Sequence, residues 1–120
     1  MSADVTRLAN GLIIVTESTP HLETSALGVW VDAGARHERE DEHGLSHLLE
    51  HMAFKGTQKR KTYHILSSID SVGGELNAYT TKEKICFYAS LLDNYFDKAV
   101  EILTDITFFS IFPEKELNKE

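Results

Sequence analysis

Two histidines and a glutamate lie within five consecutive residues, His47-Leu48-Leu49-Glu50-His51. On a helix, His47 and His51 are one turn apart on the same face, and Glu50 projects beside them. Two imidazoles in this arrangement can bind one zinc ion. Glu50 can then accept a proton from a zinc-activated water, as a general base does. The spacing predicts a site for amide hydrolysis, with the H-E-x-x-H order of thermolysin-type enzymes reversed.

The competing interpretation is a solvated helix face that carries these three residues by chance. The surrounding pattern argues against it, because residues 44–54 have helical spacing with an apolar face opposite the histidines. The residues of that face, which we expect in the core, are Leu45, Leu48, Leu49 and Met52.

His43 is the other histidine on the polar face, four residues before His47. His43 and His51 would lie about 12 Å apart along a helix, too far to join His47 at one tetrahedral ion. We therefore expect a surface role for His43 rather than a third zinc ligand.

Charge and cysteine content exclude several other classes of protein. The 120 residues carry a formal charge of −7, which argues against a nucleic-acid or membrane surface, since both need a basic patch. We interpret Lys59-Arg60-Lys61 as a solvated loop. The one cysteine, Cys86, lies in an apolar pattern and is expected to be a small buried hydrophobe. Secretory and membrane-spanning segments are not expected, so we predict a soluble chain in a reducing compartment.

Periodicity predicts the elements that position the motif. Short strands are expected on either side of Asn10-Gly11, a hairpin signal, within residues 5–16. Alternation predicts further strands at residues 25–32, 75–81 and 84–92, the first of them covered on both faces. Helices are expected at residues 44–54, 65–72 and 94–111, with a further one starting after Pro113. This order predicts an α+β fold with a mixed, mainly antiparallel sheet packed against helices.

Three stretches resemble the pitrilysin family of zinc metallopeptidases, which includes insulysin and the mitochondrial processing peptidases. The first runs from Gly44 to Thr57 (GLSHLLEHMAFKGT) and contains the motif. The others run from Trp30 to Glu38 (WVDAGARHE) and from Gly73 to Thr80 (GGELNAYT). The likeness extends over nearly the whole chain, from about Val5 to Glu120.

The resemblance implies a role for several residues. His47 and His51 would bind zinc, Glu50 would be the catalytic base, and Asn77 and Ala78 would line the substrate cleft. In this family an edge strand pairs with an extended substrate through main-chain hydrogen bonds. A purely structural role for Asn77, in local hydrogen bonds at a strand end, is the alternative.

The family's third zinc ligand is a glutamate on a later helix, expected beyond Glu120. Residues 1–120 would then be the N-terminal portion of one metallopeptidase domain, without its remainder or a C-terminal domain. Glu120 is a candidate for a supporting acid near that ligand. Alone, the chain is expected to bind zinc weakly, to have little activity and to self-associate through uncovered apolar surface.

The expected partners are a peptide or unfolded protein substrate and the missing C-terminal part or a partner subunit. A different function within the same fold is a non-catalytic scaffold or recognition subunit. Loss of a motif residue would favour that function, whereas His47, Glu50 and His51 are all present. The expected compartment is the bacterial cytoplasm, with an organellar matrix after processing as the alternative.

Overall fold

A three-stranded antiparallel sheet lies at the centre of the computed structural model, which describes residues 3–32, 34, 36 and 38–110. Its strands are β3 (Thr24–Val31), β4 (Glu75–Thr80) and β5 (Ile85–Leu92). The order β3-β5-β4 makes β5 the central strand and leaves β3 and β4 at the edges. Each predicted strand agrees with the observed one to within one residue at both ends.

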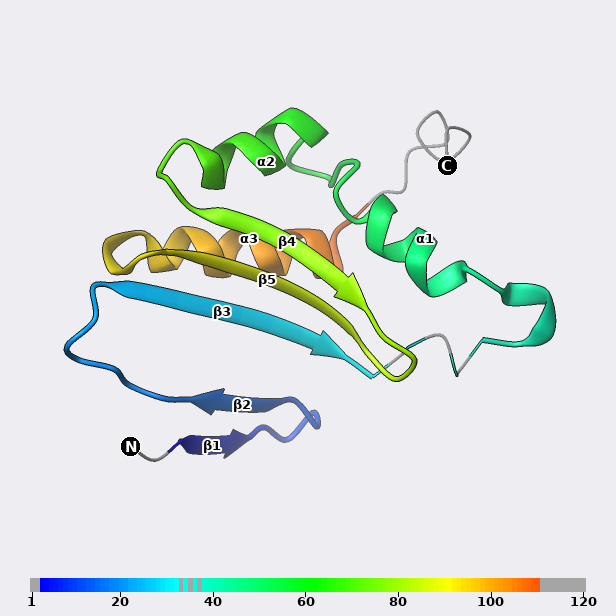
Figure 1. The fold of residues 1–120 in the computed structure, drawn as a ribbon, viewed down its shortest axis with the longest axis horizontal. Coiled ribbons are helices and arrows are strands. Elements are labelled where there is room, and N and C mark those ends of the chain that lie inside the picture. Colours follow the sequence, from blue (N-terminus) through cyan, green and yellow to red (C-terminus); the bar gives the residue numbers. More distant parts are fainter. Residues whose placement is uncertain (1–2, 33, 35, 37, 111–120) are drawn as a thin grey trace.

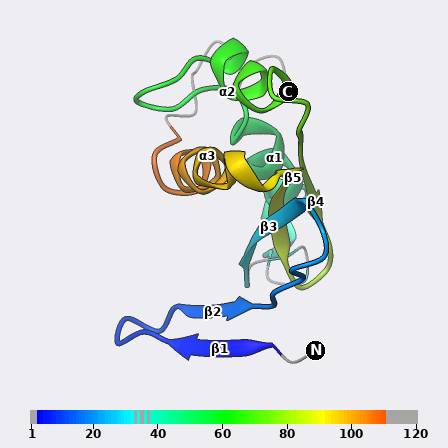
Figure 2. The ribbon, with the colours of Figure 1, turned by 90° about the vertical axis from the view of Figure 1, so that its left-hand side faces the viewer.

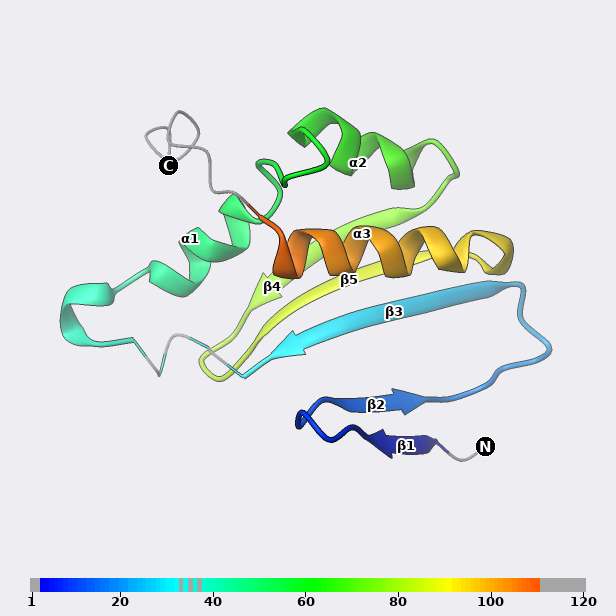
Figure 3. The same ribbon diagram turned by 180° about the vertical axis from the view of Figure 1, so that it is seen from behind.

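Helices cover one face of this sheet. Helices α2 (Thr62–Asp70) and α3 (Phe96–Phe108) pack on that face, and α1 (Leu45–Met52) lies beside the end of β4 (Figures 1 and 3). Short 3-10 turns at Glu40–Glu42 and Asp93–Tyr95 precede α1 and α3. Seen along the strands, the helices lie on one side of the sheet (Figure 2). The α+β prediction is confirmed, although α2 begins three residues earlier than expected.

The core forms between the sheet and these helices. Alternate residues of β5 point into it, and apolar side chains of α2 and α3 fill the facing layer, as period-2 and helical patterns require. Its buried members are Ala53, Ile65, Ile69, Ile85, Phe87, Ala89, Leu91, Ala99, Ile102, Leu103 and Ile106. Cys86 is also buried, as predicted. No helix among the described residues is long and apolar enough to cross a membrane.

Two burial predictions are wrong. Of the apolar residues of α1, only Met52 is buried, whereas Leu45 and Leu49 are each 39% exposed. The reason is that α1 lies beside the sheet rather than across it, so its first turns meet no second layer among the described residues. Strand β3 is not covered on both faces either, since Trp30 is 59% exposed on the face opposite the helices.

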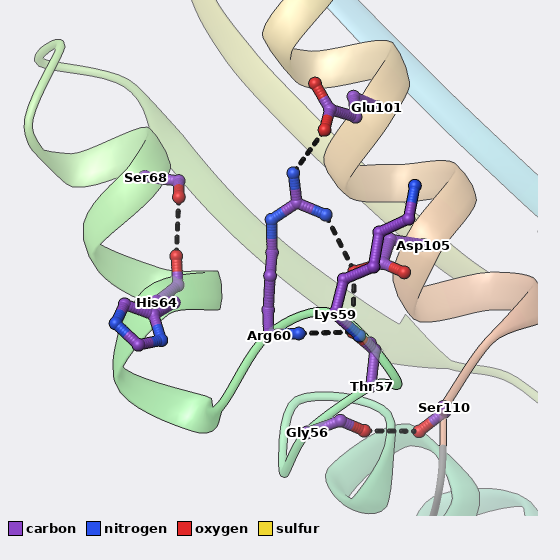
Figure 4. A network of polar contacts seen from close by, with 9 residues as sticks. All are labelled: Gly56, Thr57, Lys59, Arg60, His64, Ser68, Glu101, Asp105 and Ser110. Carbon is purple, nitrogen blue, oxygen red and sulfur yellow. Dashed lines mark hydrogen bonds and ion pairs between the residues drawn. The ribbon is translucent and has the colours of Figure 1, made fainter.

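The prediction that residues 59–61 form a solvated loop is wrong for Arg60, whose side chain is mostly buried. Its guanidinium binds Asp105 of α3 at 2.8 Å and also pairs with Glu101 (Figure 4). Thr57 donates to the same Asp105 carboxylate at 2.6 Å. Burial opposes the charge of Arg60, but the two carboxylates outweigh it and raise the pKa of the guanidinium. The network ties the segment between α1 and α2 to α3.

The hairpin at the N-terminus confirms the Asn10-Gly11 signal. Strands β1 (Asp4–Arg7) and β2 (Ile13–Thr16) pair with each other in a separate two-stranded sheet. Gly11 has a φ of +93°, and the Asn10 side chain accepts from the backbone N–H of Leu12 at 3.0 Å. The residues predicted after Pro113, and Glu120 with them, lie outside the described residues.

Candidate zinc and catalytic site

The start of α1 is fixed by a carboxylate six residues upstream. Glu38 accepts hydrogen bonds from the backbone N–H groups of Gly44, at 2.7 Å, and Leu45, at 3.2 Å. These are donors that a helix leaves unsatisfied at its N-terminus, where negative charge is also favoured. Gly44 has a φ of +86°, which favours glycine at the turn into the helix. Glu38 and Gly44 therefore set where α1 begins, and with it the position of the histidines.

His47, Glu50 and His51 come together on α1 as the spacing predicted. Each offers one donor atom, and these three atoms lie within 4.8 Å of one another. The two imidazole rings have centroids 4.3 Å apart, and His47 Nδ1 lies 3.9 Å from Glu50 Oε2. His47 and His51 are exposed, while the Glu50 side chain is 15% exposed. The carboxylate is therefore held against the protein and the imidazoles face outward.

This donor set suits zinc. Neutral imidazoles are common zinc ligands, and two of them bound to one tetrahedral ion have nitrogens roughly 3.4 Å apart. Donor atoms within 4.8 Å reach that separation through small rotations of exposed rings. His43 is not in this group of close donors, the one such group found among the described residues.

Glu50 has a partner that the sequence did not reveal. The hydroxyl of Thr80, the last residue of β4, donates a hydrogen bond to Glu50 Oε2. Thr80 lies 30 residues from Glu50, so helical spacing says nothing about this contact. Strand alternation could have placed Thr80 on the same face as Ala78, but not opposite Glu50.

The two predicted cleft residues lie on the same edge strand and point to opposite faces. Asn77 is exposed on the open face of the sheet, and its side-chain oxygen accepts from the backbone N–H of Ala78 at 2.8 Å. Ala78 packs against the core. Strand β4 contacts α1, so both residues are on the element that borders the motif. Neither the hydrogen bond between Asn77 and Ala78 nor their burial indicates a role in substrate binding.

An open pocket of about 580 Å³ borders the motif. Its wall combines one motif histidine, the residues just before α1 and the turn after β4: Arg36, Glu38, His43, Gly44, His47, Thr80, Thr81 and Lys82. The turn is braced from outside. Arg36 donates its backbone N–H to the Lys82 carbonyl at 2.7 Å, and its side chain pairs with Glu83. Gly34 packs closely against the same turn, because a Cβ at this position would lie 2.5 Å from the Glu83 backbone.

Comparison with known proteins gives the family. The family model for insulinases, peptidase family M16, matches residues 13–120. The chain belongs to peptidase family M16. This family agrees with the resemblance found in the sequence. Proteins similar to the chain bear the names of zinc proteases and mitochondrial-processing peptidases.

Two of these relatives show the range of the family. The chain is 46% identical over 111 residues, 92% of its length, to an uncharacterized zinc protease, YmxG, of Bacillus subtilis. It is 44% identical over 116 residues, 97% of its length, to the beta subunit of the mitochondrial-processing peptidase of Mus musculus. These alignments cover 27% and 24% of the two relatives, so the chain spans about a quarter of their length.

Proposed function

We propose that this chain carries the zinc-binding histidines and the general base of an M16 metalloendopeptidase. The observation that carries the proposal is the cluster of His47, Glu50 and His51 on α1, with donor atoms within 4.8 Å of one another. His47 and His51 would hold the ion. When bound, zinc polarises the amide carbonyl and makes a water more acidic.

Glu50 would then transfer the proton of the attacking water. Its carboxylate, on the same face of α1 as the histidines, takes a proton from the attacking water as the new C–O bond forms. It later gives that proton to the leaving amine nitrogen, so one side chain serves as base and then acid. The side chain is largely shielded from solvent, which keeps its orientation defined.

The strand next to α1 supports a proposal for the substrate class. Strand β4 is at an edge of the described sheet and borders α1. An extended peptide could pair with such an edge through main-chain hydrogen bonds, with Asn77 and Ala78 as the candidate contacts. This favours an unfolded peptide or presequence as substrate.

Residues 1–120 would supply the N-terminal portion of the metallopeptidase domain. A further acidic zinc ligand, the other half of the cleft and a C-terminal part or partner subunit would complete it, since the relatives are about four times as long. A bacterial cytoplasm or an organellar matrix suits the named relatives. The 120 residues alone would then bind zinc weakly and cleave little. A scaffold or recognition subunit remains the alternative, but the intact motif favours the peptidase.

The test is peptide cleavage by the complete protein encoded by the reading frame that contains this sequence. We expect chelator-sensitive cleavage of an unstructured peptide, and a Glu50→Gln variant that keeps its zinc but loses about 10²–10⁴-fold in kcat. A metal-loaded complete protein that cleaves no peptide, or a Glu50→Gln variant with full activity, would contradict the proposal. Cleavage by the 120-residue chain alone would contradict its expected inactivity.

A further inference from the structure

The carboxylate of Glu50 is held from two elements. Helix α1 supplies its backbone, and β4 supplies Thr80, whose hydroxyl donates to Glu50 Oε2. A glutamate has three side-chain torsions, the last of them broad, so a helix alone leaves its carboxylate free to rotate. A donor from a second element removes much of that freedom.

Thr80 is itself well fixed. Leu76, Ala78 and Thr80 alternate along β4 toward the core side, which directs Thr80 at α1. Its register partner on β5 is Ile85, and the turn between the strands is closed by Thr81 N–H donating to the Lys84 carbonyl at 2.8 Å. Because threonine is β-branched, few side-chain rotamers are open to it.

Thr80 also lies beside the proposed zinc and catalytic site. It lines the open pocket beside the motif, together with His47. The same Glu50 oxygen that accepts from Thr80 lies 3.9 Å from His47 Nδ1. The hydroxyl therefore orients the carboxylate at the border between the histidines and that pocket.

From this arrangement we propose that Thr80 is a positioning residue, whose hydroxyl holds the Glu50 carboxylate in the orientation that the general base needs. The inference rests on the proposed function, because it assigns Thr80 to the same reaction. Since the hydroxyl donates to Glu50, its removal should affect the chemical step rather than substrate binding. A threonine that merely satisfied its own hydroxyl would affect stability alone.

The activity test uses the complete protein and three variants. Thr80→Val keeps the shape of the side chain and removes the donor, and we expect kcat to fall about tenfold with KM and zinc affinity unchanged. Thr80→Ser keeps the donor and should recover most of kcat. The matched control is Thr57→Val, which removes a threonine hydrogen bond to a different buried carboxylate, that of Asp105 on α3. It should lower stability and leave kcat unchanged.

A second measurement needs no activity. In the metal-free protein, the shifts in denaturation midpoint caused by Thr80→Val and Glu50→Ala should be non-additive, because the two residues share one bond. Additive shifts, a wild-type kcat in Thr80→Val, or a Thr80→Ser variant as slow as Thr80→Val would each overturn the inference. If the wild-type protein cleaves nothing, the proposed function fails, and the double-mutant cycle still decides whether Thr80 holds Glu50.

Discussion

Glu50 occupies the point where α1 and β4 meet. Its carboxylate is next to His47 on its own helix and accepts from Thr80 on the strand. The histidines, in contrast, are exposed and are positioned by α1, whose first turn is capped by Glu38. At the scale of single residues, the candidate site is therefore a carboxylate held from two elements beside two exposed imidazoles.

Cys86 allows a prediction at the same scale. The residue is 1% exposed, and burial raises the pKa of its thiol, although a hydrogen bond with Tyr79 opposes part of that shift. We expect the native chain to react with a thiol reagent about 100-fold more slowly than the denatured chain, because labelling requires local opening. Equal labelling rates would contradict the burial of Cys86.

The raised pKa of Cys86 also predicts that the stability of the fold depends on pH. The native state keeps a proton that the unfolded state loses above the ordinary thiol pKa of about 9. The free energy of unfolding should therefore fall as the pH rises above that value. A Cys86→Ala variant, measured by denaturant unfolding between neutral and alkaline pH, should lose this part of the dependence.

The residues that the sequence could predict are those whose positions depend on local geometry. His47, Glu50 and His51 lie within two turns of one helix, so their spacing was sufficient to group them. The bonds of Thr80 to Glu50 and of Arg60 to Asp105 join residues 30 and 45 positions apart. They depend on how strand and helices pack, which periodicity does not specify.

At the scale of elements, the Arg60 network joins α3 to the segment that follows α1. The Asp105 side chain is 4% exposed and that of Arg60 is 18% exposed. Removing one partner leaves a buried charge without its counterpart, so Arg60→Ala should lower the free energy of unfolding by about 3 kcal/mol. Urea unfolding of the chain measures this change.

A matched control for Arg60→Ala is available on the surface. Arg39 pairs with Asp41 at 3.8 Å, and both side chains are more than three-quarters exposed. Arg39→Ala should change the free energy of unfolding by less than about 0.5 kcal/mol. Equal losses in the two variants would show that the Arg60 network has no special structural role.

Strand boundaries could be predicted better than burial. The alternation in β5 reflects its central place in the sheet, where one face packs on helices. The leucines of α1 had the same kind of apolar pattern but remain partly exposed. An apolar pattern identifies the face of a helix that tends to be buried. Whether another element covers that face depends on the tertiary structure, which the sequence of one helix does not specify.

At the scale of the whole molecule, the β1–β2 hairpin stands apart from the main sheet (Figures 1 and 2). Val5 and Val15 pair across it and are 55% and 62% exposed. Two-stranded hairpins are marginally stable alone, and uncovered apolar faces favour association. A second copy or a further segment could cover this face.

We therefore expect the 120-residue chain to self-associate as its concentration rises. Sedimentation velocity should show a growing fraction of dimers or larger species. Val15→Lys should reduce that fraction, because it places a charge on the apolar face of the hairpin. Thr6→Lys adds the same charge on the other face and is the control. A chain that stays monomeric at all concentrations would contradict the expectation.

Zinc binding by the complete protein tests the central claim most directly. Titration followed by calorimetry, with metal content measured after dialysis, gives stoichiometry and affinity. We predict one zinc ion per chain for the wild-type protein and for Glu50→Gln, no retained zinc for His51→Ala, and an unchanged affinity for His43→Ala. A wild-type protein that binds no zinc, or a His51→Ala variant that retains it with wild-type affinity, would contradict the assignment of His47 and His51 as the ligands.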